Sequence, residues 1–278
     1  MKKILLTAVV SAIATITMAQ LAPRVSPTSK IEQKVGLTDV SLTYSRPGKK
    51  DRVVFGDLVP FGEIWRTGAN ENTTITFGDA VVFGKDTLKA GTYALYTKPD
   101  KESWDIIFYK KSDNWGTPEE WDETQVALRV AVKPTALKDV VETFTIAFEN
   151  LQTSGASLSL TWDKTKVMVP FSVPTDTKVM ANIKKTMSGP SANDYFGAAQ
   201  YYYDNKKDLK QALVWAEQAA TMRPDAYWII RLHALILAEV GDKKAAIEKA
   251  KIALELATKA DNQDYVKMLN KSIEEWSK

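Results

Sequence analysis

Regular alternation of apolar and polar residues marks most of the chain before residue 174. Val40, Leu42 and Tyr44 alternate with polar neighbours, and the same period recurs at residues 74–77, 126–132, 144–148, 158–162 and 167–173. A period of two is expected of strands that bury one face. Shorter apolar segments at residues 81–83, 93–96 and 104–109 lie between turn-forming dipeptides. We therefore predict an antiparallel β-sandwich over residues 20–173, with an extended lead-in at residues 21–30.

The apolar period lengthens to that of helices after Pro174. Residues 174–190 predict a connecting helix that Gly189 and Pro190 terminate. Beyond it, Asp208, Ala212, Ala216 and Ala219 recur 34 residues later as Asp242, Ala246, Ala250 and Ala253. That spacing is the period of a tetratricopeptide repeat, although Lys207 replaces the usual turn glycine and Thr258 the closing proline. We predict an all-α, tetratricopeptide-like region over residues 191–278, closed by a C-terminal capping helix.

The N-terminal residues have the three regions of a secretory signal peptide. Lys2 and Lys3 precede an apolar run at residues 4–16, and small residues follow up to Ala19. We expect cleavage between Ala19 and Gln20, hence a periplasmic or secreted protein with no membrane insertion after cleavage. Because the chain contains no cysteine, it is expected to be neither a lipoprotein nor disulfide-linked.

Composition excludes several chemistries. With no cysteine and a single histidine, the chain lacks the ligands of structural zinc and the partners of a cysteine nucleophile. That histidine, His233, falls among apolar residues of the helical region and is expected to be packed there. A Ser-His-Asp hydrolase is therefore not expected. The formal charge of +3 gives no electrostatic case for nucleic acid. We expect no cofactor and no metal site.

Binding-type side chains concentrate around residues 58–77. The candidate ligand-binding residues are Arg46, Arg52, Trp65, Arg66, Asn70 and Glu71. The three arginines would donate to an acidic or hydroxylated group, the tryptophan would offer a stacking face, and Asn70 and Glu71 would fix orientation. We expect a non-enzymatic module that recognises a polar small molecule, a glycan or a protein partner.

Two alternatives stay open beside that interpretation. A carbohydrate-active hydrolase would use Glu63 with Glu71, or Asp113 with Glu119, as paired carboxylates. Its sugar-stacking platforms would come from Trp104, Trp115 and Trp121. A structural envelope protein would instead use the arginines as a network that stabilises the fold. The loop that carries Trp115 and Trp121 either covers an end of the core or forms a binding surface, and the first interpretation is favoured.

A family resemblance rests on the same residues. The run YSRPGKKDRVVFGDLVPFGEIWRTGANENTTITF, the segment KAGTYALYTKP and the closing Leu160-Thr161-Trp162 resemble a secreted family known as domain of unknown function 2911. The resemblance extends over about residues 24–173, and W-R-T-G-A-N-E is its most specific element. It implies an exported β domain, often followed by a helical tail, and supplies no catalytic residue.

Overall fold

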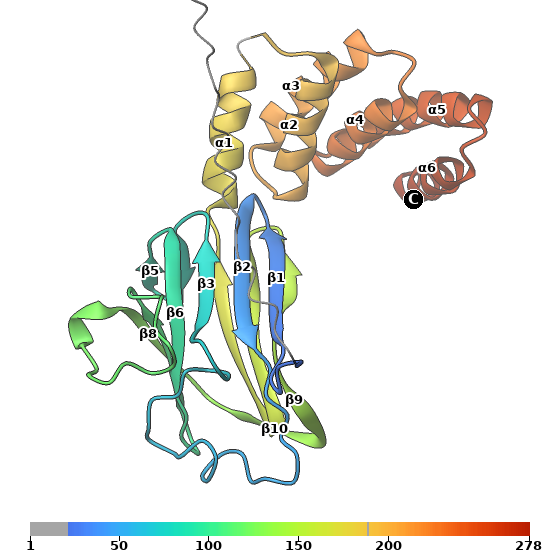
Figure 1. Cartoon of the computed structure of the whole chain (residues 1–278). Coiled ribbons are helices and arrows are strands. Elements are labelled where there is room, and N and C mark those ends of the chain that lie inside the picture. Colours follow the sequence, from blue (N-terminus) through green and yellow to red (C-terminus); the bar gives the residue numbers. More distant parts are fainter. Residues whose placement is uncertain (1–21, 188) are drawn as a thin grey trace, which may run out of the picture. The chain divides into compact units, whose positions relative to one another are not determined.

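The computed structural model describes residues 22–187 and 189–278, which form two compact units. The first unit ends at Thr175 and the second comprises Asp176–Lys278 (Figure 1). The predicted signal peptide, residues 1–19, lies outside the described residues. Within the described part of the chain, no helix has both the length and the apolar character needed to cross a bilayer.

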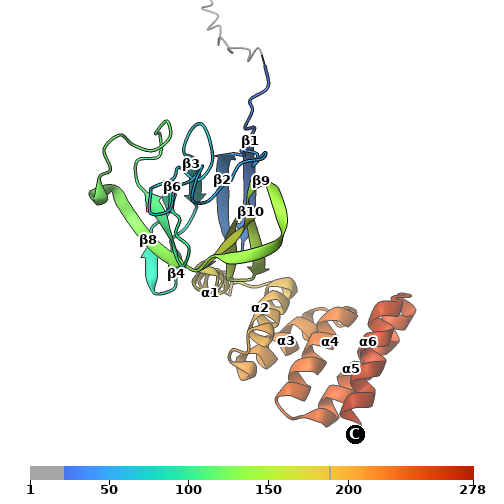
Figure 2. The same cartoon turned by 90° about the horizontal axis from the view of Figure 1, so that it is seen from below.

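The first unit consists of antiparallel strands in two sheets. Its strands are β1 (Thr28–Val35), β2 (Thr38–Ser45), β3 (Thr73–Phe77), β4 (Val81–Phe83), β5 (Asp86–Leu88), β6 (Gly91–Lys98), β7 (Trp104–Tyr109), β8 (Val126–Val132), β9 (Thr135–Gln152) and β10 (Gly155–Ser172). One sheet has the order β1-β2-β3-β6-β7-β8 and the other the order β5-β4-β10-β9. Figure 2 shows β1, β2 and β3 beside one another in the larger sheet.

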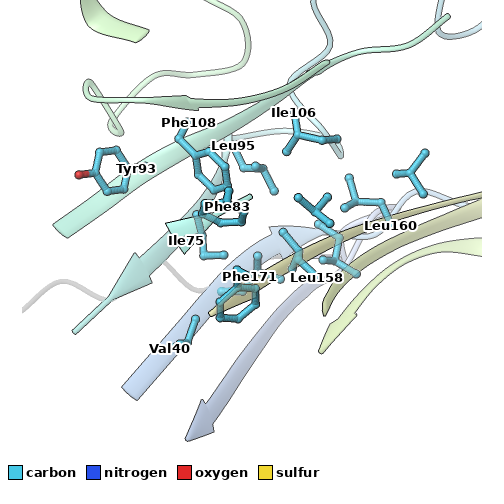
Figure 3. Packing of buried hydrophobic residues seen from close by; sticks show 14 of the residues in the cluster. Val40, Ile75, Phe83, Tyr93, Leu95, Ile106, Phe108, Leu158, Leu160 and Phe171 are labelled. Carbon is cyan, nitrogen blue, oxygen red and sulfur yellow. The ribbon is translucent and has the colours of Figure 1, made fainter. Parts of the chain in front are cut away.

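The two sheets share one hydrophobic core. Val40, Ile75 and Phe108 from the larger sheet and Leu158 and Phe171 from the smaller belong to the same buried cluster (Figure 3). Since successive side chains of a strand point to opposite faces, the alternation in the sequence places these residues inward. The prediction of antiparallel strands with one apolar face is therefore confirmed.

The strand predictions differ from the structure at β1, β5, β9 and β10: β5 was not predicted, and β9 extends beyond the predicted residues 144–148 at both ends. The strand β1 occupies part of the predicted lead-in and pairs with β2 along its whole length, Thr28 facing Ser45. The separate strands predicted at residues 158–162 and 167–173 form the single strand β10. Its ladder with β9 has register shifts on both sides of Asp163, whose φ of 51° bends the strand without ending it. The polar run after Trp162 therefore lies where the ladder shifts register, with the extra residues on β9, and not in a turn.

The second unit is helical. Among the described residues it contains α1 (Thr175–Thr186), α2 (Ala192–Asp204), α3 (Leu209–Met222), α4 (Tyr227–Glu239), α5 (Lys243–Lys259) and α6 (Gln263–Trp276), with Thr175 itself assigned to the first unit. Asp208 and Asp242 cap α3 and α5 by accepting from backbone N–H groups in the first turn. The repeated alanines of α3 and α5 are fully buried, which allows neighbouring helices to approach closely.

Candidate functional site

The connection between β2 and β3, residues 46–72, is tied to the end of the core by Trp65. Its backbone exchanges two hydrogen bonds with Thr97 of β6, at 2.7 and 3.0 Å. Its indole stacks on that of Trp162, with the ring centroids 5.7 Å apart and the planes at 17°. Phe55 and Phe144 approach it edge-on. One face of Trp65 is therefore occupied by the protein itself.

The backbone after Trp65 is held in an unusual conformation. Thr67 is β-branched and fully buried, yet its φ is 57°, and Asn70 has a φ of 59°. The Thr67 hydroxyl contacts the carbonyl of Trp65, and the Thr73 hydroxyl donates to the carbonyl of Thr67 at 2.6 Å. Strained residues persist where surrounding hydrogen bonds over-determine them, and they concentrate at functional sites.

A pocket of about 300 Å³, which we call the arginine pocket, opens beside this backbone. Three cationic side chains line it: Lys50, Arg52 and Arg66. Trp65 and Trp162 contribute apolar surface, and no carboxylate belongs to the lining within the described chain. Electrostatically, the pocket is arranged for a negatively charged group.

The cations of the arginine pocket are incompletely satisfied. Arg52 donates from Nε and Nη2 to the carbonyls of Lys49 and Gly48. Within residues 22–187 and 189–278, the guanidinium of Arg66 has no hydrogen bond or ion pair, although it is half-buried. Its Nη1 atom lies against Gly116, where a Cβ atom would stand only 2.9 Å away. The structure thus brings three predicted residues, Arg52, Trp65 and Arg66, to one pocket.

The remaining predicted residues lie elsewhere. Arg46 donates from Nε to the carbonyl of Phe144 at 3.1 Å and from Nη2 to the hydroxyl of Thr145 at 2.7 Å. Asn70 donates to the carbonyl of Ser26. Glu71 forms an exposed ion pair with Arg24 at 2.8 Å. Arg46 and Asn70 tie segments of the fold together, whereas Glu71 borders a second pocket.

That second pocket, which we call the sheet-face pocket, measures about 800 Å³. It lies among the starts of β1 and β3, the end of β2 and residues 112–115. Asn72 and Trp115 line it together with Arg24 and Glu71. Asn72 belongs to the polar stretch at residues 58–77 but was not among the predicted ligand-binding residues, and Arg24 stands in no recognisable pattern. Trp115 was recognisable in the sequence as a possible binding residue because it stands in a long loop with two tryptophans.

Tyr96 fixes the loop that carries Trp115. Its hydroxyl donates to the carbonyl of Gly116 at 3.0 Å and accepts from the side chain of Asn114 at 3.1 Å. Burial raises the pKa of Tyr96 to about 12, so this phenol stays protonated at neutral pH. Trp121 packs on Tyr96 and covers the sheet, whereas Trp115 is 72% exposed. The loop therefore packs Trp121 on a small cluster of β6 and β7 that is separate from the main core, and presents Trp115 as an exposed tryptophan; it does not cover an end of the core as expected.

The carboxylates considered for hydrolysis are not paired around a closed cleft. Glu63 and Glu119 are exposed, and Glu71 and Asp113 border the sheet-face pocket. Hydrogen bonds from its own backbone amide and from Arg24 lower the pKa of Glu71. A general acid needs the opposite shift. In the described residues no three His, Asp or Glu side chains gather as a metal site would require.

These features define a class: a mainly antiparallel β unit with a polar loop site, followed by a helical unit. The chain belongs to the family described as Protein of unknown function (DUF2911), whose model matches residues 26–171, more than half of the 278 residues. The match runs from the segment before β1 into β10 and agrees with the resemblance found in the sequence. No curated protein and no solved structure matches the chain.

Proposed function

We propose that the chain is an exported, non-enzymatic binding protein whose arginine pocket holds an anionic group of a polar ligand. In this proposal the first unit is a β-sandwich that carries the site. The helical unit is a tetratricopeptide-like array that offers a second surface for a protein partner. The ligand's carboxylate, sulfate or phosphate would lie between Arg52 and Arg66, with Lys50 adding charge at the edge.

The carrying observation is that, among the described residues, the Arg66 guanidinium has no partner and its pocket is lined by cations and no carboxylate. Half-buried arginines are normally paired, because desolvating a charge without a partner is costly. An incoming anion would supply that partner, and a guanidinium binds planar or tetrahedral oxyanions through two parallel hydrogen bonds. The same anion would reduce the repulsion between Arg66 and Arg52.

The other predicted residues take supporting roles in this proposal. Trp65 forms part of the floor, because its stacked face is already occupied by Trp162. Arg46 and Asn70 hold the neighbouring strand and lead-in through the contacts that their side chains make. This division combines the predicted binding site with the alternative of a fold-stabilising arginine network. The lowered pKa of Glu71 argues against this carboxyl as the general acid of the hydrolase alternative.

The test is calorimetric titration of the full chain with sodium sulfate, sodium phosphate and sodium galacturonate at low ionic strength. We expect at least one of these anions to bind, with affinity that falls as salt rises. Arg66→Gln should weaken that binding at least about tenfold, since charge-assisted hydrogen bonds are worth roughly 1.5–3 kcal/mol. Lys85→Gln removes the same charge from an exposed turn of the same unit and should bind like the unsubstituted protein. Binding of none of the three anions, or equal binding by both variants, would refute the proposal.

Export is tested separately by fractionating native cells and sequencing the N-terminus of the protein. The expected result is a periplasmic or extracellular protein that begins at Gln20. A cytoplasmic protein that retains residues 1–19 would contradict this part of the proposal and leave the binding experiment unaffected.

A further inference from the structure

The sheet-face pocket differs chemically from the arginine pocket. Thr43 and Thr74 are cross-strand partners on β2 and β3; Thr43 lies between Leu42 and Tyr44 of the main core, and Thr74 directly precedes Ile75 of the same core. Alternation therefore places both hydroxyls on the face opposite that core. Further hydroxyls come from the start of β1 and from Ser112. At about 800 Å³ the pocket falls within the usual range of small-molecule sites, about 300–1,000 Å³.

The charges at this pocket largely compensate one another. Arg24 contacts both carboxylate oxygens of Glu71, at 2.8 and 2.9 Å. Asp113 is the remaining charged side chain of the lining. An anionic ligand would meet this carboxylate without a free cation to balance it. The lining therefore suits a ligand that is neutral and rich in hydrogen-bonding groups.

Asn72 supplies a buried acceptor that lacks a partner. The residue is 5% exposed, and its Nδ2 donates to the carbonyls of Thr73 and Ser112 at 3.1 and 3.2 Å. Two carbonyl acceptors fix which end of the amide is the nitrogen. Among the described residues, no donor reaches its Oδ1 atom. A buried acceptor left without a hydrogen bond costs roughly 1–3 kcal/mol, and a ligand hydroxyl recovers this energy only when the Asn72 side chain turns its inaccessible Oδ1 atom toward the pocket.

Trp115 supplies an apolar platform on the same pocket. Its indole is 72% exposed, while the residues on either side of it are anchored through Tyr96. Asn72 adds a third anchor, because its backbone N–H donates to the carbonyl of Asn114 at 3.3 Å. A large aromatic ring held in place over a pocket of hydroxyl and amide groups binds ligands that are apolar on one face and polar at the edge.

We propose that the sheet-face pocket binds a neutral carbohydrate. Trp115 packs against the C–H face of a sugar ring, Thr43 and Thr74 bind ring hydroxyls, and Asn72 Oδ1 accepts from a further hydroxyl once its side chain turns toward the pocket. This site is separate from the anion site and does not rest on it. Three segments contribute residues to the lining of both pockets. They are residues 24–28, residues 66–72 and the loop at residues 112–117.

The test is affinity electrophoresis of the full chain in gels containing dextran, laminarin, xyloglucan, galactomannan, arabinoxylan or starch, followed by calorimetry with the matching oligosaccharide. We expect at least one neutral polysaccharide to retard the protein. Trp115→Ala should weaken this binding about tenfold or more, and it should fold normally because the side chain is mostly exposed.

Thr74→Val tests the pocket without touching the tryptophan. It removes one hydroxyl while keeping a β-branched strand residue, and it should also weaken binding. Thr76→Val is the matched control on the same face of β3, outside the pocket lining, and should bind normally. Arg66→Gln should likewise leave neutral-sugar binding unchanged, which separates this site from the anion site. Retardation by none of the six polysaccharides, or unchanged binding by Trp115→Ala and Thr74→Val, would overturn the inference.

Discussion

Replacing Gly68 by alanine tests whether the loop after Trp65 needs a residue without a side chain. Gly68 has a φ of +148°, a region that L-residues rarely adopt. An added Cβ would stand 2.8 Å from the carbonyl oxygen of Ser45 and 3.2 Å from the Thr73 hydroxyl. The nearer atom belongs to the backbone of β2, so it cannot move aside without disturbing the sheet.

The expected loss in the free energy of unfolding has two parts. Backbone strain contributes about 1–2 kcal/mol, as for other L-residues forced to positive φ. Overpacking against fixed backbone adds about 1–3 kcal/mol. Gly62→Ala separates these parts, because Gly62 lies in the same loop at a φ of +77° with nothing within 4 Å of an added Cβ. It should show the strain alone.

Hydrogen exchange measured by mass spectrometry on the full chain reports the result, because buried amides of β3 and β6 exchange through unfolding of their own unit. We expect Gly68→Ala to lower their protection by about 2–5 kcal/mol and Gly62→Ala by about 1–2 kcal/mol. Equal losses in the two variants, or protection in Gly68→Ala within about 0.5 kcal/mol of the unsubstituted protein, would show that the reasoning is wrong.

Three further predictions concern stability. Arg46→Gln removes hydrogen bonds to Thr145 and to a backbone carbonyl of β9, and should lower protection of the β unit by about 1–3 kcal/mol; a change below about 0.5 kcal/mol contradicts this. Gly197 lies in an exposed turn of α2, and no atom lies near a Cβ added there. Gly197→Ala should therefore stabilise the helical unit by about 0.5–1 kcal/mol, measured by denaturation followed by circular dichroism at 222 nm; destabilisation would contradict this. Burial, and then the charge of Lys249, lowers the pKa of His233 below 6.5, so the unfolded chain binds a proton more readily than the folded one. Thermal melts should therefore show full stability of the helical unit above about pH 6.5 and a loss as the pH falls below it, and His233→Gln should reduce that slope; an unchanged slope contradicts the assignment.

The sequence predicted most strands because burial of one face imposes a period of two. Its errors have physical causes. The strand β1 has few buried side chains and lies at a sheet edge, so its alternation is weak. The strand β10 stays continuous through Asp163 because its pairing with β9 resumes on both sides, and the extra residues of the two register shifts lie on β9. In the helical unit, the 34-residue spacing of small residues correctly located fully buried positions such as Ala216 and Ala250.

The sheet-face pocket could not be predicted from local sequence patterns, because the residues that line it are distant in sequence. Asn72 and Ser112 are 40 positions apart and meet through a single side-chain hydrogen bond. Nothing in the neighbourhood of Asn72 indicates that one end of its amide is satisfied and the other is not. Trp115 and Trp121 are tryptophans of the same loop, so the sequence does not distinguish them. In the fold, Trp115 is exposed and Trp121 packs on Tyr96.

The same distinction applies to the arginines. Arg46 and Arg66 were selected together because a guanidinium near a turn offers the same chemistry wherever it stands. In the fold, Arg46 has two acceptors that hold β2 to β9, whereas the Arg66 guanidinium has no partner within the described residues. A donor that the fold has already satisfied contributes to stability, and a half-buried donor without a partner remains available to a ligand. For this reason we expect replacement of Arg66 to remove anion binding while the free energy of unfolding changes little.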